Sequence, residues 1–176
     1  MVQLQVDAST EGLGAVLILG GQAASYFTVA ITAGMRQWLE VPETARVESR
    51  FVAALEFLTI LLAVRTWRQR VRDTLPGRVQ VAVRTDSAAA MGAALKFSSS
   101  APRMNEVAKE LCADGAAGMF TFDIIDHVPG LQNCWADTLS HLRVPDELTK
   151  LTPASPPEVD AALWTAKSVP PVPQAV

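Results

Sequence analysis

Four acidic side chains occupy positions where their type could do chemistry. Glu56 is the only charged residue between Phe51 and Val64, a stretch typical of a largely buried helix. An ionised carboxylate there is costly unless something compensates it, and no Lys or Arg lies three or four residues away. Asp7, Asp86 and Asp137 are the other three acids. Because carboxylate oxygens are the ligands that divalent cations such as Mg2+ prefer, these positions point to a metal site.

The elements around these acids could aim them at one place. Asp7 ends an alternating strand on its polar face, and Asp86 directly follows a second predicted strand. If the two strands run parallel and adjacent, both carboxylates lie at the edge where α/β folds hold ligands. Glu56 on a long helix and Asp137 on the last helix could project towards that edge. Four carboxylates would repel without cations, and two divalent ions at such a cluster can cleave a phosphodiester.

The order of elements predicts an α/β fold. We expect strands at residues 2–7, 15–19, 24–31, 79–85 and 120–127, and helices at 45–72, after residue 87, at 104–113 and at 133–142. Gly20-Gly21 predicts a hairpin, a loop holding Pro42 precedes the long helix, and Pro76-Gly77 ends it. The predicted fold is a five-stranded mixed sheet, with three antiparallel strands and then two parallel ones, flanked by helices.

The composition changes from Pro145 onwards. The last part of the chain is rich in proline, with one possible helical turn or two around residues 158–166. We therefore expect one domain at residues 1–144 and a Pro-rich extension or linker, loosely docked, at residues 145–176.

Composition and charge exclude several classes of protein. With 176 residues, 49% of them hydrophobic, the chain can form one domain with a real core. The net charge of −3 argues against a dedicated nucleic-acid binder. No apolar run is long enough for a membrane span, and no secretory signal is visible. Two cysteines, Cys112 and Cys134, suit a reducing compartment, so we expect an intracellular protein of the cytoplasm or nucleus.

Four motifs carry a resemblance to a known family. They are Val6-Asp-Ala-Ser-Thr-Glu-Gly-Leu-Gly-Ala-Val16, Leu55-Glu-Phe-Leu-Thr-Ile-Leu-Leu-Ala-Val-Arg-Thr-Trp67, Arg84-Thr-Asp-Ser87 and His127-Val-Pro-Gly-Leu-Gln-Asn-Cys-Trp-Ala-Asp-Thr-Leu-Ser140. From about residue 2 to residue 142, in this order, the chain resembles the ribonuclease H domains of retroelement reverse transcriptases of the gypsy or DIRS type.

The resemblance implies a complete catalytic assignment. Asp7, Glu56, Asp86 and Asp137 would be the catalytic residues and the ligands of two Mg2+ ions, or of Mn2+. The implied reaction is hydrolysis of the RNA strand of an RNA/DNA hybrid. The implied partner, besides the hybrid, is a reverse transcriptase domain in a parent polyprotein.

Two departures from the family pattern concern histidines. Many members carry a His in a loop before the last helix, but the stretch from Pro129 to Asn133 is too short for that loop. His127, on or just after the fifth strand, is expected to be structural. The family's Leu-Ser-Arg ending is Leu-Ser-His141 here, which removes a permanent cation.

Other interpretations of the acids remain open. Asp7 could be a strand-end residue, Asp86 only an N-cap, and Asp137 part of a solvated helix face. Transposase, integrase and proofreading exonuclease patterns fit less well, since position 9 is Ser and an acid lies on the first helix. A decayed, connection-type scaffold or nucleic-acid-binding domain is the non-enzymatic alternative.

Several other polar residues are weaker candidates. Glu48, with Arg46 and Arg50 beside it, is an alternative helix acid. Asp123 and Asp126 on the fifth strand are expected to be surface or edge charges, with a position of Asp126 near the cluster as the alternative. The basic residues that could contact phosphate, or could simply be solvated, are arginines 65, 68, 70, 72 and 78, and Arg103 beside Ser98 to Ser100.

Overall fold

The computed structural model describes residues 2–74, 80–118, 121–129 and 132–165. Its strands are β1 (Val2–Ala8), β2 (Gly12–Leu19), β3 (Gln22–Ala30), β4 (Gln80–Thr85) and β5 (Thr121–His127). Its α-helices are α1 (Ala33–Leu39), α2 (Val52–Thr74), α3 (Ala88–Lys96), α4 (Pro102–Ala116) and α5 (Cys134–Ser140). Short 3-10 turns form at Ser49–Phe51, Asp146–Leu148 and Ala161–Leu163.

The strands form one mixed sheet in the order β3-β2-β1-β4-β5. β2 pairs antiparallel with both β1 and β3, and Gly20 and Gly21 make the hairpin turn with positive φ of 59° and 85°. β4 pairs parallel with β1, with Gln5 opposite Arg84, and β5 pairs parallel with β4. A parallel pair needs a long connection, and the chain between β1 and β4 runs through β2, β3, α1 and α2. The predicted α/β class with a mixed sheet flanked by helices is confirmed.

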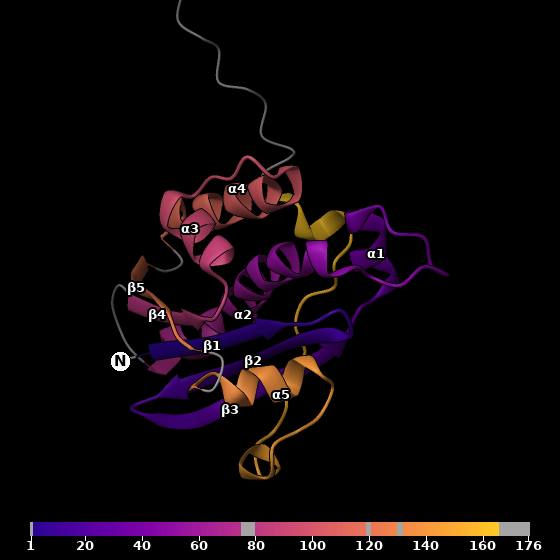
Figure 1. The fold of residues 1–176 in the computed structure, drawn as a ribbon. Helices are drawn as coiled ribbons and strands as arrows, with labels where there is room; N and C mark the ends of the chain where they lie inside the picture. Colours follow the sequence, from indigo (N-terminus) through magenta and orange to yellow (C-terminus); the bar gives the residue numbers. More distant parts are fainter. Residues whose placement is uncertain (1, 75–79, 119–120, 130–131, 166–176) are drawn as a thin grey trace, which may run out of the picture.

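Helices cover both faces of the sheet (Figure 1). α2 lies on one face against β1 and β2, and α5 lies on the other face against the same two strands. α3 contacts α2 and the strands β4 and β5, and α4 packs on α2 and α3. Gly14 on β2 allows α5 to come close, since a Cβ at this position would lie only 2.5 Å from the Ala136 carbonyl oxygen. The two helices therefore bracket the strand that carries Asp7.

The buried face of α2 forms the centre of the core. Seven residues from Phe57 to Ala63 are each fully buried, and Trp67 stacks on Phe27 at a ring-centroid distance of 5.5 Å. Trp67 therefore anchors α2 in the core. None of the helices in the described ranges is long and apolar enough to span a membrane.

Two helix predictions need correction. The long helix begins at Val52 instead of residue 45, because residues 40–48 form a loop and Ser49–Phe51 a 3-10 turn. A helix was not expected at Ala33–Leu39, where α1 forms. The Thr32 hydroxyl caps it by accepting a hydrogen bond from the Met35 N–H at 3.2 Å. The predicted break at Pro76-Gly77 lies outside the described residues.

The tail from residue 145 to residue 165 packs on the domain. Leu148 joins a buried cluster with Val16 and Tyr26, and Val159 and Leu163 belong to the main core. The domain boundary at residues 144/145 remains a prediction, and residues 166–176 lie outside the described ranges. The described tail is held by buried apolar anchors, so it is not loosely docked there.

Polar and aromatic contacts hold the tail along its course. Next to Pro153, the Ala154 N–H donates to the Tyr26 carbonyl on the β3 edge at 2.7 Å. Near its end, the Arg65 guanidinium donates to the Leu163 carbonyl at 2.6 Å. Trp164 stacks on Trp38 of α1 at 5.5 Å. The tail therefore connects the sheet edge to α1 and α2.

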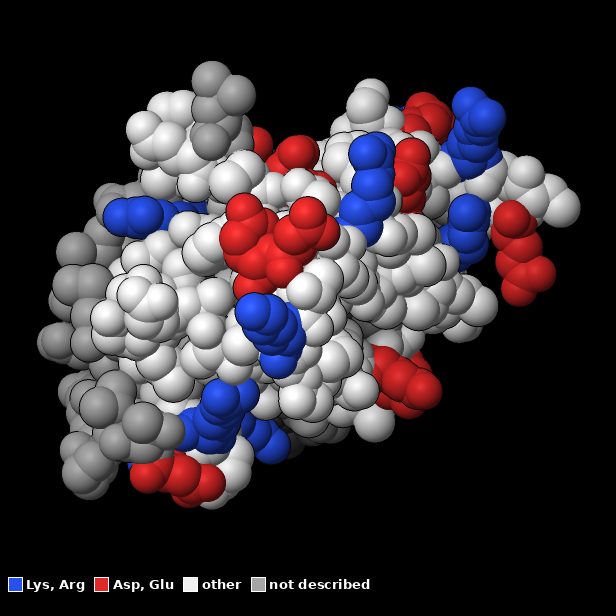
Figure 2. Space-filling view, turned by 90° about the horizontal axis from the view of Figure 1, so that it is seen from below, with Lys and Arg blue, Asp and Glu red and all other residues white. Residues whose placement is uncertain are grey.

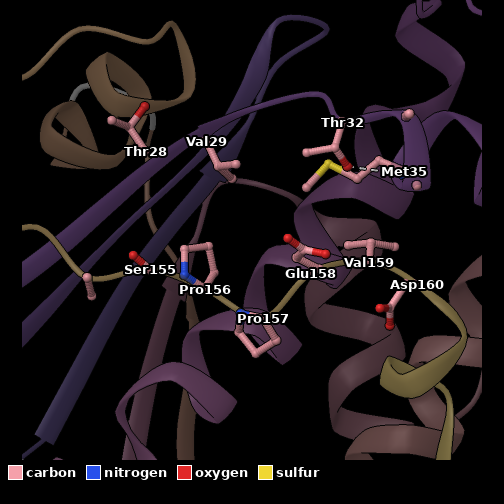
Figure 3. A pocket seen from close by; sticks show the side chains of 13 residues that line it. Thr28, Val29, Thr32, Met35, Ser155, Pro156, Pro157, Glu158, Val159 and Asp160 are labelled. Atoms are coloured by element: carbon pink, nitrogen blue, oxygen red, sulfur yellow. Dashed lines mark hydrogen bonds between the residues drawn. The ribbon is translucent and has the colours of Figure 1, made fainter.

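A cavity of about 580 Å³ lies between the tail and the domain (Figure 3). Residues 154–160 form one wall, and the end of β3 with the start of α1 forms the other. At Gly34 the tail passes so closely that an added Cβ would lie 1.9 Å from the Val159 carbonyl oxygen. The charged residues that line the cavity are Glu158 and Asp160, and none of the four candidate acids lines it.

Candidate active site

Three of the four predicted acids converge at one edge of the sheet. Asp7, Glu56 and Asp86 each offer a carboxylate oxygen, and these oxygens all lie within 4.8 Å of one another. Asp7 lies near the carboxyl end of β1, and Asp86 directly follows β4. The two strands are parallel neighbours, so these ends meet at the same edge. Glu56, in the second turn of α2, reaches the same edge because α2 lies across β1.

Burial and mutual repulsion disfavour the ionised forms of two of these acids. Asp7 is 5% exposed and Glu56 is 6% exposed. Burial, together with repulsion from Asp86 and Glu56, raises the pKa of Asp7 to about 8 against an opposing hydrogen bond from Ser140. Burial, together with repulsion from Asp86, raises the pKa of Glu56 to about 7 against an opposing hydrogen bond from Ser87. The cluster therefore favours either bound protons or a compensating cation.

Two serine hydroxyls contact the cluster. The Ser87 hydroxyl caps α3 by accepting from the Ala90 N–H at 3.1 Å, and its proximity to Glu56 lowers the pKa of that acid. The Ser140 hydroxyl, at the end of α5, donates to the Asp137 carbonyl at 2.8 Å, and its proximity to Asp7 lowers the pKa of that acid. The sequence suggests Asp86 as the cap, whereas the cap is Ser87, and it does not predict that either hydroxyl lies beside the acids. The Thr-Asp-Ser and Leu-Ser motifs contain these hydroxyls, but only the fold shows what they face.

Asp137 does not join the cluster, although the sequence predicts that all four acids converge. It lies in the first turn of α5, on the opposite face of the sheet from α2, and its side chain is 57% exposed. Its carboxylate lies 3.9 Å from the Nε2 atom of His141, whose Nδ1 atom is 3.6 Å from the carboxylate of Glu11. As a metal ligand, Asp137 remains a prediction.

The helix that carries Asp137 is nevertheless fixed beside Asp7. The buried Asn133 side chain donates to the Val6 carbonyl at 2.8 Å, one residue before Asp7. The Ser9 hydroxyl donates to the Ser140 carbonyl at 2.8 Å. These bonds tie the start of α5 to β1 and its end to the β1–β2 loop.

The weaker acidic candidates lie elsewhere. Glu48 is exposed and pairs with Arg50 at 3.1 Å, as expected of a solvated charge. Asp123, Asp126 and His127 belong to β5, whose side chains lie outside what the structure describes.

Of the arginines predicted as candidate phosphate contacts, some form ion pairs within the protein and others are exposed. Arg65 is nearly buried and forms ion pairs with Glu110 and Asp114, each at 2.7 Å, so it is a structural residue. Arg103 pairs with Glu40 and Glu106. Arginines 68, 70 and 72 are exposed on α2, and Arg78 lies outside the described residues.

Surface charge is mixed on the face seen from the α5 side (Figure 2). Acidic and basic side chains lie there in small separate groups, with acids gathered near the centre. On that face, the described residues form no continuous basic surface. This agrees with the net charge of −3 and gives little attraction for a polyanion.

Comparison with known proteins identifies the fold. No family model matches the chain, and no curated protein matches it. Among solved structures it is similar to the N-terminal ribonuclease H domain of a Mycobacterium tuberculosis protein, solved as a fusion with maltose-binding protein. The TM-score is 0.55 at 16% sequence identity, covering 82% of this chain and 98% of that chain. The chain therefore has a ribonuclease H-like fold.

Proposed function

We propose that this chain is a metal-dependent endonuclease that hydrolyses the RNA strand of RNA/DNA hybrids. The observation that carries this proposal is the buried cluster of Asp7, Glu56 and Asp86 at the carboxyl edge of a ribonuclease H-like sheet. None of the ion pairs among the described residues involves Asp7 or Glu56. A divalent cation would supply the missing positive charge through the oxygen ligands it prefers.

The residues present fit such a cation. Asp7, Glu56 and Asp86 would hold Mg2+, or Mn2+, and Asp137 is proposed as a fourth ligand on the strength of its sequence motif. Two bound ions of this kind supply an activated water and stabilise the leaving oxygen of a phosphodiester. The protein's own contribution is to hold three carboxylates together at a sheet edge before any cation binds.

The biological context is proposed from the sequence motifs alone. By their resemblance, the domain would serve a retroelement reverse transcriptase inside the cell, next to a polymerase domain of the same polyprotein. The small basic content of the chain supports this arrangement, because a tethered polymerase would supply affinity for the hybrid.

Cleavage of a labelled RNA/DNA hybrid by the whole chain in Mg2+ or Mn2+ tests the proposal. Single-stranded RNA, double-stranded RNA and double-stranded DNA are the substrate controls. Asp86→Asn should abolish cleavage, and Asp146→Asn, an exposed acid on a 3-10 turn of the tail, should not. Equal cleavage by Asp86→Asn and the unmodified chain would contradict the proposal.

A nucleic-acid-binding scaffold without activity is the second candidate. It is favoured by the exposure of Asp137 outside the cluster. Hybrid binding without cleavage at any Mg2+ or Mn2+ concentration, and without stabilisation of the fold by either cation, would support the scaffold instead.

A further inference from the structure

Asn133 begins α5, but its side chain does not bind where an asparagine at such a position usually does. It is the N-cap residue, with φ −102° and ψ 24°, yet its side chain makes no hydrogen bond to the first turn of α5. Asn is a preferred N-cap because its side-chain oxygen normally accepts from that turn. Here the side chain is fully buried, and its Nδ2 atom donates to the Val6 carbonyl at 2.8 Å. The side chain therefore bonds to β1 and not to its own helix.

The position of the accepting carbonyl links this bond to the acidic cluster. The parallel pairing of β1 with β4 ends at Gln5, so Val6 lies one residue beyond that ladder. The carbonyl of Val6 and the nitrogen of Asp7 belong to the same planar peptide group. The bond from Asn133 therefore fixes the peptide plane that leads into Asp7, one of the three clustered acids.

The backbone of Asn133 is bonded to the fourth candidate acid. Its carbonyl accepts from the Asp137 N–H at 3.0 Å, one helical turn further along α5. Two hydrogen bonds in succession thus connect the peptide before Asp7 to the backbone of Asp137, and Asn133 takes part in both. This bridge sets the position of Asp137 along β1 relative to Asp7.

The buried amide of Asn133 also carries a free-energy cost. Its Oδ1 atom is buried and has no hydrogen-bond partner among the described residues. An unpaired buried acceptor destabilises a fold, whereas an apolar side chain of similar size would bring no such group. An unsatisfied polar atom and an unused cap at one residue break two local rules, as is typical of functional sites.

We propose that Asn133 is a positioning residue for the metal site, which holds Asp137 in register with Asp7 so that both acids can serve the same cations. This inference rests on the proposed function, since it assumes that the cluster binds divalent cations and that Asp137 is the fourth ligand. Without the bond to Val6, α5 can shift along β1, and each binding event has to order Asp137 again. Loss of a residue that orients a metal ligand typically lowers metal affinity by about 10- to 100-fold.

The chain offers variants that separate positioning from packing and capping. Asn133→Leu keeps a similar volume and removes both the donor and the unpaired acceptor. Asn133→Ser retains a residue that caps helices as well as Asn does, but its side chain is too short for the bond to Val6. Thr28→Val is the matched control, since the Thr28 hydroxyl donates to the Leu139 carbonyl at 2.6 Å and ties the other end of α5 to β3.

Mn2+ binding to the whole chain, measured by electron paramagnetic resonance, is the main experiment, and thermal melting in a chelator checks the fold. Asn133→Leu and Asn133→Ser should both weaken Mn2+ binding about 10- to 100-fold. Thr28→Val should lower the melting temperature and leave the Mn2+ affinity unchanged. If Asn133 acts through Asp137, a double variant of Asn133→Leu and Asp137→Asn should bind Mn2+ no more weakly than Asp137→Asn alone. Independent effects would instead multiply.

Several results would overturn the inference while leaving the proposed function standing, provided that the unmodified chain binds Mn2+ and cleaves hybrid. Unchanged Mn2+ affinity in Asn133→Leu and Asn133→Ser would show that Asn133 does not position the site. Fold changes that multiply in the double variant would show that Asn133 acts independently of Asp137. An equal loss of affinity in Thr28→Val would show that general docking of α5 is what matters.

A different result would overturn both proposals. If the unmodified chain binds no Mn2+ and does not cleave hybrid, the proposed function fails and the role of Asn133 fails with it. If Asn133→Leu does not fold, Asn133→Ser, alone and combined with Asp137→Asn, decides the question in the same way.

Discussion

Replacing Glu56 by Gln should stabilise the metal-free protein at neutral and alkaline pH. The substitution removes a carboxylate that burial and Asp86 hold against ionisation, and it retains the size of the side chain. What changes is therefore mainly the charge.

The magnitude follows from the pKa of Glu56, which the fold raises from 4.5 to about 7. At a pH below 4.5 the folded and unfolded states both hold the proton, so the carboxyl group costs nothing. As the pH rises towards 7, the unfolded state releases its proton first, and the free energy of unfolding falls. One pKa unit corresponds to about 1.4 kcal/mol, which makes the full cost above pH 7 about 3 kcal/mol.

Urea unfolding in a chelator at several pH values measures this effect. Glu56→Gln should be more stable than the unmodified chain by about 2–3 kcal/mol at pH 8, and the difference should vanish near pH 4.5. Glu48→Gln, an exposed acid paired with Arg50, should show no such dependence. Added Mg2+ should stabilise the unmodified chain more than the Gln variant. If Glu56→Gln lost several kcal/mol at pH 8 without metal, Glu56 would have a structural partner and the reasoning would fail.

Three further predictions concern the whole chain. Without metal, the free energy of unfolding should decrease as the pH rises from about 4 to about 8, because the pKa of Asp7 is also raised. Mg2+ should reduce this pH dependence, and a pH dependence of urea unfolding that Mg2+ leaves unchanged would count against a cation site. Ending the chain after residue 144 should lower the melting temperature or prevent folding, since it removes buried Leu148 and Leu163; a melting curve by circular dichroism that matched the whole chain would contradict this. Binding to hybrid should be weak, fall steeply between low and physiological salt, and rise when a basic module is fused; tight binding that is insensitive to salt would contradict this.

The sheet and the main crossover could be predicted because their sequence signals are local. β1 alternates, Gly20-Gly21 marks the hairpin, and the apolar run around Glu56 is too long for a strand. α1 has no comparable signal, since seven residues give fewer than two full turns of periodicity and its packing comes from Trp38 meeting the tail. The packing of the tail on the domain was not predicted, because the composition of this segment shows mainly its prolines. Its buried residues, Leu148, Val159 and Leu163, follow neither helical nor strand spacing.

At the site, the sequence predicts which residues matter better than where they lie. The motif order correctly placed Asp7, Glu56 and Asp86 at one edge, because strand direction and chain order decide that. The orientation of Asp137 depends on the rotation of α5 about its axis, which its contacts with β1 and β2 set. The proximity of Ser87 to Glu56 likewise depends on the packing of α3 against α2, so no local pattern contains it.

The free-energy cost of placing three acids together helps to distinguish a nuclease from a scaffold. A domain that only needed this fold would be more stable with a neutral residue at position 56, where Leu55 and Phe57 on either side are fully buried. Three acids within 4.8 Å of one another at a sheet edge weaken the metal-free protein at neutral pH, and a bound divalent cation would recover that loss. A strong gain in stability from Mg2+, lost in Glu56→Gln, would thus favour the nuclease even before any substrate is added. If the protein were a scaffold whose stability did not depend on Mg2+, the acidic cluster would have no function.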